Sequence, residues 1–171
     1  MFLVLLAGPG LRAEVFLTPD QALSEAFSGA DRVDRVTLYL TEEQARRIEA
    51  SARSKLESHV LTRHTAMRGG SVAGYAYFDT HVVRTMPETL LVVLTPEARV
   101  SQVLILAFAE PDDYRPRPRW LATLQERALD SELWPGRGVP KITGATLTAQ
   151  AITDAVRRIL AVHSVTLETS P

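Results

Sequence analysis

The C-terminal part of the chain carries the clearest pattern of apolar positions. Apolar side chains recur there at i, i+3, i+4, i+7 and i+8, namely at Ile152, Ala155, Val156, Ile159 and Leu160. This spacing places them on one stripe of an α-helix, because a strand would alternate them at every second residue. The pattern therefore predicts an amphipathic helix over 149–162 that packs on a sheet.

Two earlier helices are predicted from signals at their N-terminal ends. A Thr-x-x-Gln pattern at 18–21, with Pro19 at the first helical position, predicts a short helix from Pro19 to about Phe27. A second Thr-x-x-Gln pattern at 41–44 opens a segment with one apolar stripe and three charge pairs at i,i+4. This segment is expected to be an amphipathic surface helix, with the stripe Ala45, Ile48, Ala52 and Leu56 and the pairs Glu42/Arg46, Glu43/Arg47 and Glu49/Arg53.

The pattern changes to that of strands between these helices and residue 109. Residues 34–40 alternate apolar and polar side chains closely enough to predict a strand. Three further segments follow at hairpin spacing: GYAYFDTHVV from Gly74, ETLLVVLT from Glu88 and VSQVLILAFA from Val100. They predict an antiparallel meander whose apolar runs are covered on both faces or lie centrally in the sheet. Together with the flanking helices this is an α+β fold.

Of the other segments, only residues 120–129 show a helical pattern. Residues 57–73, which contain His59, His64 and two adjacent glycines, are predicted to form a loop or a hairpin approach, and two histidines without a nearby carboxylate are a weak metal-ligand set. Three prolines and clustered charge predict a loop over 110–119, and residues 133–140 form a second irregular stretch. Between them, residues 120–129 are expected to be helical.

Composition limits the chemistry. The chain has 171 residues, no cysteine, and 19 Lys and Arg against 20 Asp and Glu. This is the size of one compact domain, and the small net charge argues against nucleic-acid binding. Without cysteine there is no disulfide, thiolate nucleophile, iron–sulfur cluster or covalently attached c-type haem. A redox role therefore needs an organic cofactor or another metal.

The first seven residues, MFLVLLA, form a short apolar run that is followed by Gly-Pro-Gly and by Leu11-Arg12-Ala13. The run is shorter than the about 20 apolar residues needed to span a bilayer, but it fits the apolar region of a secretory signal peptide. We therefore expect a signal peptide over 1–13, a single domain over 14–171 and an extracytoplasmic protein with no further membrane span. The alternatives are a buried first strand or a disordered end.

Candidate chemistry is concentrated just before the last predicted helix, in the sequence KITGATLT at 141–148. Gly144 and Ala145 leave space beside the backbone, and Thr146 and Thr148 lie where the helix begins. Free N–H groups and the positive end of the helix dipole make this position favourable for an anion. The alternative is that Thr148 only caps the helix.

The six residues Thr143, Gly144, Ala145, Thr146, Leu147 and Thr148, followed by an amphipathic helix, resemble the [Ser/Thr]-Gly-Ala-Thr-x-Thr motif of the FMN-binding domain family. That family includes the flavin-carrying C subunit of the sodium-translocating NADH:quinone reductase and the G subunit of the Rnf complex. The resemblance extends to GYAYFDTHVV, to the paired strands after it and to Glu110-x-x-x-Tyr114. It covers about residues 70–163.

The resemblance implies a covalent FMN, held through a phosphoester to the hydroxyl of Thr146, in an electron carrier rather than a stand-alone catalyst. Amides at the start of the helix could stabilise the negative charge that the phosphodiester retains. Two partners are implied: a separate Mg-dependent flavin transferase and a membrane redox complex. The chain departs from the pattern at Pro140, where the family usually has an acidic residue, and at Asp112-Asp113, where it has Pro-Gly.

Aromatic side chains could supply the flat apolar walls that a flavin ring needs, although each could instead belong to the core. The candidates are Tyr75, Tyr77, Tyr114 and Trp134. Asp79 and His81 are in phase with the first two tyrosines, and we expect a solvated strand face there rather than a catalytic pair. An arginine cluster could bind phosphate or an acidic partner, or only solubilise its loop; it comprises Arg115, Arg117 and Arg119.

Two other functions remain open. One is a flavin-free extracytoplasmic binding or assembly module with a degenerate attachment motif, which Pro140 favours. The other is a soluble flavin reductase that binds FMN without a covalent bond. Neither a catalytic residue nor a metal ligand is assigned.

Overall fold

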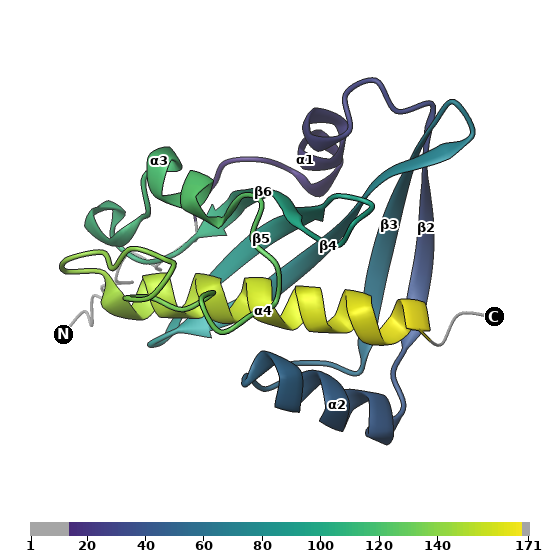
Figure 1. The fold of residues 1–171 in the computed structure, drawn as a ribbon. Coiled ribbons are helices and arrows are strands. Elements are labelled where there is room, and N and C mark those ends of the chain that lie inside the picture. The colour runs from purple at the N-terminus through teal and green to yellow at the C-terminus, as the bar shows by residue number, and fades with distance from the viewer. Residues whose placement is uncertain (1–13, 169–171) are drawn as a thin grey trace, which may run out of the picture.

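The computed structural model describes residues 14–168, which form one six-stranded antiparallel sheet with helices on both faces. The strand order is β1-β6-β5-β4-β3-β2. Figure 1 shows α4 lying along one face with α2 beside it, and α1 on the other face. In chain order the elements are β1 Glu14–Val15, α1 Pro19–Ala26, β2 Arg32–Tyr39, α2 Glu42–Ala52, β3 Val60–Arg68, β4 Ser71–Val83, β5 Met86–Leu94, β6 Val100–Phe108, the 3-10 turn η1 Asp112–Tyr114, α3 Pro118–Leu121, the 3-10 turn η2 Ala122–Leu124 and α4 Thr146–Glu168.

The predicted α+β fold and its antiparallel meander β4-β5-β6 are confirmed. The continuous apolar run of β5 has a simple cause, because the strand is central and covered on both sides. Leu90 and Val92 belong to the core under α4, whereas Leu91 and Val93 pack in a smaller core under α1. Burial on both faces removes the need for polar positions in such a strand.

Both predicted capping boxes are present. In α1 and α2 the threonine side chain accepts a hydrogen bond from the backbone of the glutamine three residues later, and that glutamine side chain accepts from the threonine N–H. Helix α2 ends at Ala52, since Arg53 adopts the left-handed conformation, so Leu56 lies beyond the helix. Glu49 binds Lys55 at 2.7 Å instead of the predicted Arg53.

One predicted segment is wrong and another is only partly right. Residues 57–73 are not a loop but match the hairpin approach that was the other prediction: they contain β3, which pairs with β2 over residues 60–67, and the beginning of β4, which pairs with β3. Residues 120–129 are not one helix, because α3 and η2 end at Leu124 and the chain turns through Glu126 at a φ of 60°. Backbone hydrogen bonds between Val100 and residues 126 and 127, at 2.8 and 2.9 Å, attach this turn to the start of β6.

Helix α4 is longer than predicted and is buried on more than one side. It begins three residues before Ala149 and continues six residues past Val162. The predicted apolar stripe is buried, but so are Arg157, Arg158 and His163. These polar residues are buried because α4 contacts both the sheet and α2.

Strands β3 and β4 separate part of the way along the sheet. They pair from Arg68 and Ser71 only as far as His64 and Ala76. Beyond that point residues 60–63 stay with β2, and residues 77–83 stay with β5. The sheet therefore forks, and a cavity lies in the fork.

The expected signal peptide over 1–13 lies outside the described residues. Within residues 14–168, no helix combines the length and apolarity needed to cross a bilayer.

Candidate functional site

Thr146 is the first residue of α4, and its side chain is exposed. Ala145 before it is fully buried, whereas Leu147 after it is 53% exposed. Gly144 has a φ of 84°, a conformation that favours glycine, and it turns the chain into the helix. This arrangement presents the Thr146 hydroxyl to solvent beside the helix N-terminus, where the first N–H groups have no partner within the helix.

Thr148 has a different role from the helix cap considered above. It lies inside the first turn of α4, is fully buried, and donates a hydrogen bond of 2.8 Å to Oε2 of Glu110. The other oxygen of Glu110 binds the guanidinium of Arg84. Arg84 in turn lies over the Tyr114 ring, with 4.7 Å between its Cζ and the ring centroid. The structure thus brings Thr148, Glu110 and Tyr114 together next to Thr146.

Arg84 was not predicted from the sequence. It occupies the turn between β4 and β5 with a φ of 57°, where a glycine or asparagine is usual. Nothing in the sequence around this turn indicates that the Arg84 side chain binds Glu110, which lies 26 residues later in the chain. Its charge compensates the buried Glu110 carboxylate, which a buried site requires.

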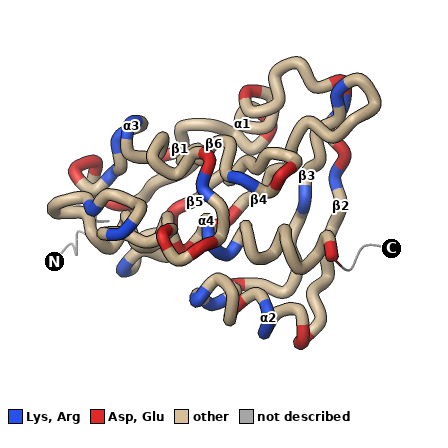
Figure 2. Tube along the Cα trace, viewed as in Figure 1, with Lys and Arg blue, Asp and Glu red and all other residues tan. Residues whose placement is uncertain are grey.

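A cavity of about 560 Å³ opens on the segment just before Thr146. Its lining includes Trp120 and the segment 140–143, and its charged groups are four cations and one carboxylate. Figure 2 shows basic positions around α3 and in the loop beside it. The charged residues of the lining are Arg115, Arg117, Arg119, Lys141 and Asp113. Such a lining favours an anionic ligand.

Pro140, the position at which the chain departs from the FMN-binding family pattern, lines this cavity. Its carbonyl accepts a hydrogen bond of 2.7 Å from Nε1 of Trp120. This contact fixes α3 against the loop that leads to Thr143. Position 140 thus contributes a backbone acceptor and no carboxylate.

Three of the predicted aromatic residues do not lie at this end of α4. The Tyr75 ring packs at a tilt against the His163 ring with 4.4 Å between ring centroids, and the Tyr77 hydroxyl lies 2.8 Å from His163 Nδ1. His163 is about 25 Å along the helix from Thr146 at 1.5 Å per residue. Trp134 packs under the guanidinium of Arg157, at 4.2 Å. The structure therefore does not bring Tyr75, Tyr77 or Trp134 together with Thr146.

Asp79 and His81 share a strand face as predicted, but that face is buried and not solvated. Asp79 Oδ1 lies 2.8 Å from His81 Nδ1, and Glu88 Oε2 lies 3.2 Å from His81 Nε2. Arg158 donates to both oxygens of Asp79. Burial alone would lower the pKa of His81, but the bonds to the two carboxylates raise it to about 9. His81 is therefore a charged imidazolium at neutral pH.

His81 lowers the pKa of both carboxylates, but the net shifts of Asp79 and Glu88 have opposite directions. Burial opposes ionisation of Asp79, yet His81 and Arg158 together hold its pKa below the ordinary value. Burial raises the pKa of Glu88 by more than the bond to His81 lowers it, and the nearby Glu110 adds to the rise. The cluster is a buried charge network close to the Glu110–Thr148 bond.

Replacing Thr148 with valine should lower the free energy of unfolding by about 2 kcal/mol, because a hydrogen bond to a buried charged group is lost without change of shape. Thr153→Val is the matched control, since Thr153 is equally buried but donates to the Ala149 carbonyl within its own helix. It should cost less than about 1 kcal/mol. Urea denaturation of both variants tests this; equal losses would contradict the role given to Glu110.

No group of three or more histidine or acidic side chains placed to hold a metal ion occurs among residues 14–168. The residues that fit an anionic cofactor are those of the first turn of α4 and of the basic cavity beside it. Comparison of the whole chain with family models, with curated proteins and with solved structures gave no match.

Proposed function

We propose that this chain is an FMN-carrying electron-transfer domain in which the flavin phosphate is esterified to Thr146. The observation that carries the proposal is the exposed Thr146 hydroxyl on the first turn of α4, within the sequence Thr-Gly-Ala-Thr-Leu-Thr. A phosphodiester at that position retains one negative charge, and the N-terminal amides of the helix stabilise such a charge.

The surroundings of Thr146 are suited to a flavin in two respects. Glu110, Arg84 and Thr148 form a bonded group that fixes the first helical turn, so the attachment point is rigid. The neighbouring cavity has a volume within the range of ordinary ligand pockets and a basic rim. The flavin supplies the redox chemistry when bound, and the protein supplies its placement and electrostatic environment.

The proposal includes an extracytoplasmic location and two partners, a flavin transferase and a membrane redox complex. Covalent attachment fits such a location, because a tethered cofactor cannot dissociate into a dilute compartment. The arginines at 117 and 119 and Lys141 are the groups on this side of the molecule that would meet an acidic partner.

Coexpression with a flavin transferase tests the proposal. The intact mass of the purified chain should increase by one FMN phosphoester and the protein should be yellow. Thr146→Ala should remove both signals completely, whereas Thr143→Ser, which keeps the [Ser/Thr] position of the motif, should retain them. An unmodified wild-type chain would contradict the proposal.

The second candidate is a flavin-free binding or assembly module, and Pro140 favours it. The family pattern has an acidic residue at this position, and here the residue serves the Trp120 contact instead. A Pro140→Asp variant separates the two functions. If wild type stays colourless with the transferase while Pro140→Asp becomes flavinylated, the natural chain is the flavin-free module.

A further inference from the structure

Strand β2 forms one edge of the sheet, and within residues 14–168 no strand pairs with its outer side. Every second residue of such an edge strand points its N–H and C=O away from the sheet. Proline, lysine or a bulge usually blocks an exposed edge, but β2 contains neither residue and pairs with β3 without a register shift. Residues 32–37 of the strand are all exposed. β2 is therefore open to a further strand.

The opposite edge of the sheet is much less open. There β1 is only two residues long, and the start of β6 is hydrogen-bonded to residues 126 and 127. The segments α3 and η2 also contact β6. β2 is thus the longer free edge, and two copies that pair through this one edge form a closed dimer rather than a chain of molecules.

The charges at the start of β2 match this kind of pairing. In the sequence Asp31-Arg32-Val33-Asp34-Arg35, each charge on one side of Val33 is opposite in sign to the charge at the same distance on the other side. Two copies paired antiparallel about a twofold axis at Val33 therefore place Asp31 opposite Arg35 of the second copy, and Arg32 opposite Asp34. Each of these two ion pairs occurs twice by symmetry.

Other registers lack this match. Directly opposed residues lie on the same face of a sheet, so the twofold axis must pass through a residue. An axis through a charged residue of β2 places that residue opposite its own copy, and like charges directly opposite are destabilising. An axis through Val36 gives Asp34 the uncharged partner Leu38. It gives Arg35 the uncharged partner Thr37.

Three of the four charged side chains have only exposed or incomplete contacts within one copy. Arg32 and Asp34 are 3.0 Å apart, with 67% and 49% of their side chains exposed, and such an exposed pair is weak. Asp31 accepts a hydrogen bond of 2.6 Å from the Gly69 N–H through Oδ2, which leaves its other oxygen for a second contact. These groups can therefore contact a second copy.

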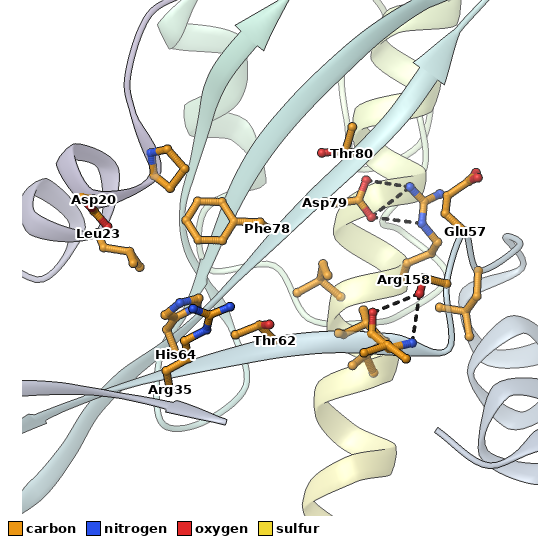
Figure 3. Close-up of a pocket in the computed structure, with 17 residues that line it drawn as sticks. Asp20, Leu23, Arg35, Glu57, Thr62, His64, Phe78, Asp79, Thr80 and Arg158 are labelled. Carbon is orange, nitrogen blue, oxygen red and sulfur yellow. Dashed lines mark hydrogen bonds and ion pairs between the residues drawn. The ribbon is translucent and has the colours of Figure 1, made fainter. Parts of the chain in front are cut away.

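Arg35 is a cation without a counter-ion. Figure 3, which looks into the cavity at the fork of β3 and β4, shows Arg35 beside His64, whereas Arg158 pairs with Asp79 elsewhere in the cavity. Within the part of the chain that the structure describes, Arg35 makes no ion pair or hydrogen bond. Its side chain is exposed. A carboxylate of a second copy would supply the counter-ion that the fold does not.

We propose that two copies of this chain associate through β2, antiparallel about Val33, and form one continuous sheet. Val33, which is 39% exposed, then faces its own copy, and Val36, which is 42% exposed, faces Ala30. The overlap covers only residues 30–36 of each copy, so the interface is small and the association is weak and reversible. Figure 1 places β2 on the side of the molecule opposite the start of α4, so the dimer leaves Thr146 uncovered.

Sedimentation velocity of the wild-type chain, expressed without a flavin transferase, tests this proposal independently of any flavin. Between low and high micromolar concentrations the chain should show a reversible equilibrium between monomer and dimer. Added salt should shift this equilibrium towards the monomer, because it screens ion pairs near the surface. A chain that stays monomeric over the whole range would overturn the proposal.

Charge variants test the register. Asp34→Arg places an arginine opposite Arg32 at both symmetric positions and should weaken dimerisation at least about tenfold. The double variant Arg32→Asp/Asp34→Arg exchanges the two charges, so they again face each other and dimerisation should return. Glu97→Arg is the matched control, since it changes the net charge equally at an exposed position between β5 and β6. It should dimerise like wild type.

All the substituted side chains are exposed, so the variants are expected to fold, and circular dichroism checks this. Two results would overturn the proposed register even if a dimer forms. One is an equal effect of Asp34→Arg and Glu97→Arg. The other is a folded double variant that stays as weakly associated as Asp34→Arg.

Discussion

Replacement of His81 with leucine should lower the free energy of unfolding by about 3 kcal/mol at pH 6, which is the cost of removing one partner from a buried charge network. His81 is enclosed by Asp79 and Glu88, and both its ring nitrogens are bonded. The loss leaves Glu88 without its hydrogen-bond partner in the fold, whereas Asp79 keeps Arg158. Urea denaturation at a series of pH values measures the effect.

The pH dependence of the free energy of unfolding shows whether the charge on His81 causes this stabilisation. The pKa of His81 is about 9 in the folded protein, against 6.5 for the free side chain. Its stabilising contribution is therefore fully present below pH 6.5 and is lost as the pH rises towards 9. Wild type should lose about 3 kcal/mol over this window, and His81→Leu should not.

His163 affects stability in a different pH range. Burial lowers the pKa of His163 to about 4, so its contribution is present above pH 6.5 and is lost as the pH falls towards 4. The exposed His59, which lies 3.5 Å from Glu42, provides the control variant His59→Gln. It should keep the alkaline loss of wild type. If His81→Leu showed the same alkaline loss as wild type, the imidazolium would not be its source.

Replacement of Arg157 with methionine is expected to have the second large effect, again about 3 kcal/mol. The Arg157 side chain is buried and donates to four backbone carbonyls from two separate segments. The acceptors are Ser51 and Ala52 at the end of α2, and Asp130 and Leu133 in the loop before α4. Methionine fills the volume but leaves these carbonyls without a donor.

Two further variants separate hydrogen bonding from charge. Arg157→Lys keeps the charge but cannot reproduce the planar guanidinium contacts, so its loss should be intermediate. Arg47→Met removes an exposed arginine that binds Glu168 at 2.6 Å and should cost less than about 1 kcal/mol. Equal losses in Arg47→Met and Arg157→Met, measured from urea midpoints at constant slope, would contradict the role given to Arg157.

The elements that the sequence predicts well are those whose local pattern agrees with their environment. The meander β4-β5-β6 has continuous apolar runs because it is central, and α1 and α2 have capping boxes that depend only on nearby residues. Strand β3 was predicted only as a loop or a hairpin approach because its sequence, VLTRHTAMR, has no regular alternation of apolar and polar residues, and its pairing with β2 across the intervening helix decides its conformation. Residues 120–129 were mispredicted since hydrogen bonds to Val100 end the helix early.

The candidate site was only partly predictable for a similar reason. The motif at 143–148 marks the start of α4, and Glu110 and Tyr114 do lie beside it. Arg84, which links those two residues, comes from a turn far away in the sequence. Arg157 and Arg158 appear as polar positions on an amphipathic helix, and only the packing of α4 against α2 and the sheet shows that they are buried.

The central claim, that Thr146 carries the flavin, is tested most directly by locating the modification. Cleavage after Lys141 and Arg157 releases the peptide 142–157, which contains four threonines, Thr143, Thr146, Thr148 and Thr153. Fragmentation of this peptide, from chain coexpressed with a flavin transferase, assigns the FMN phosphoester to one of them. The account predicts FMN on Thr146 alone; an unmodified peptide, or FMN on any other threonine, would contradict it.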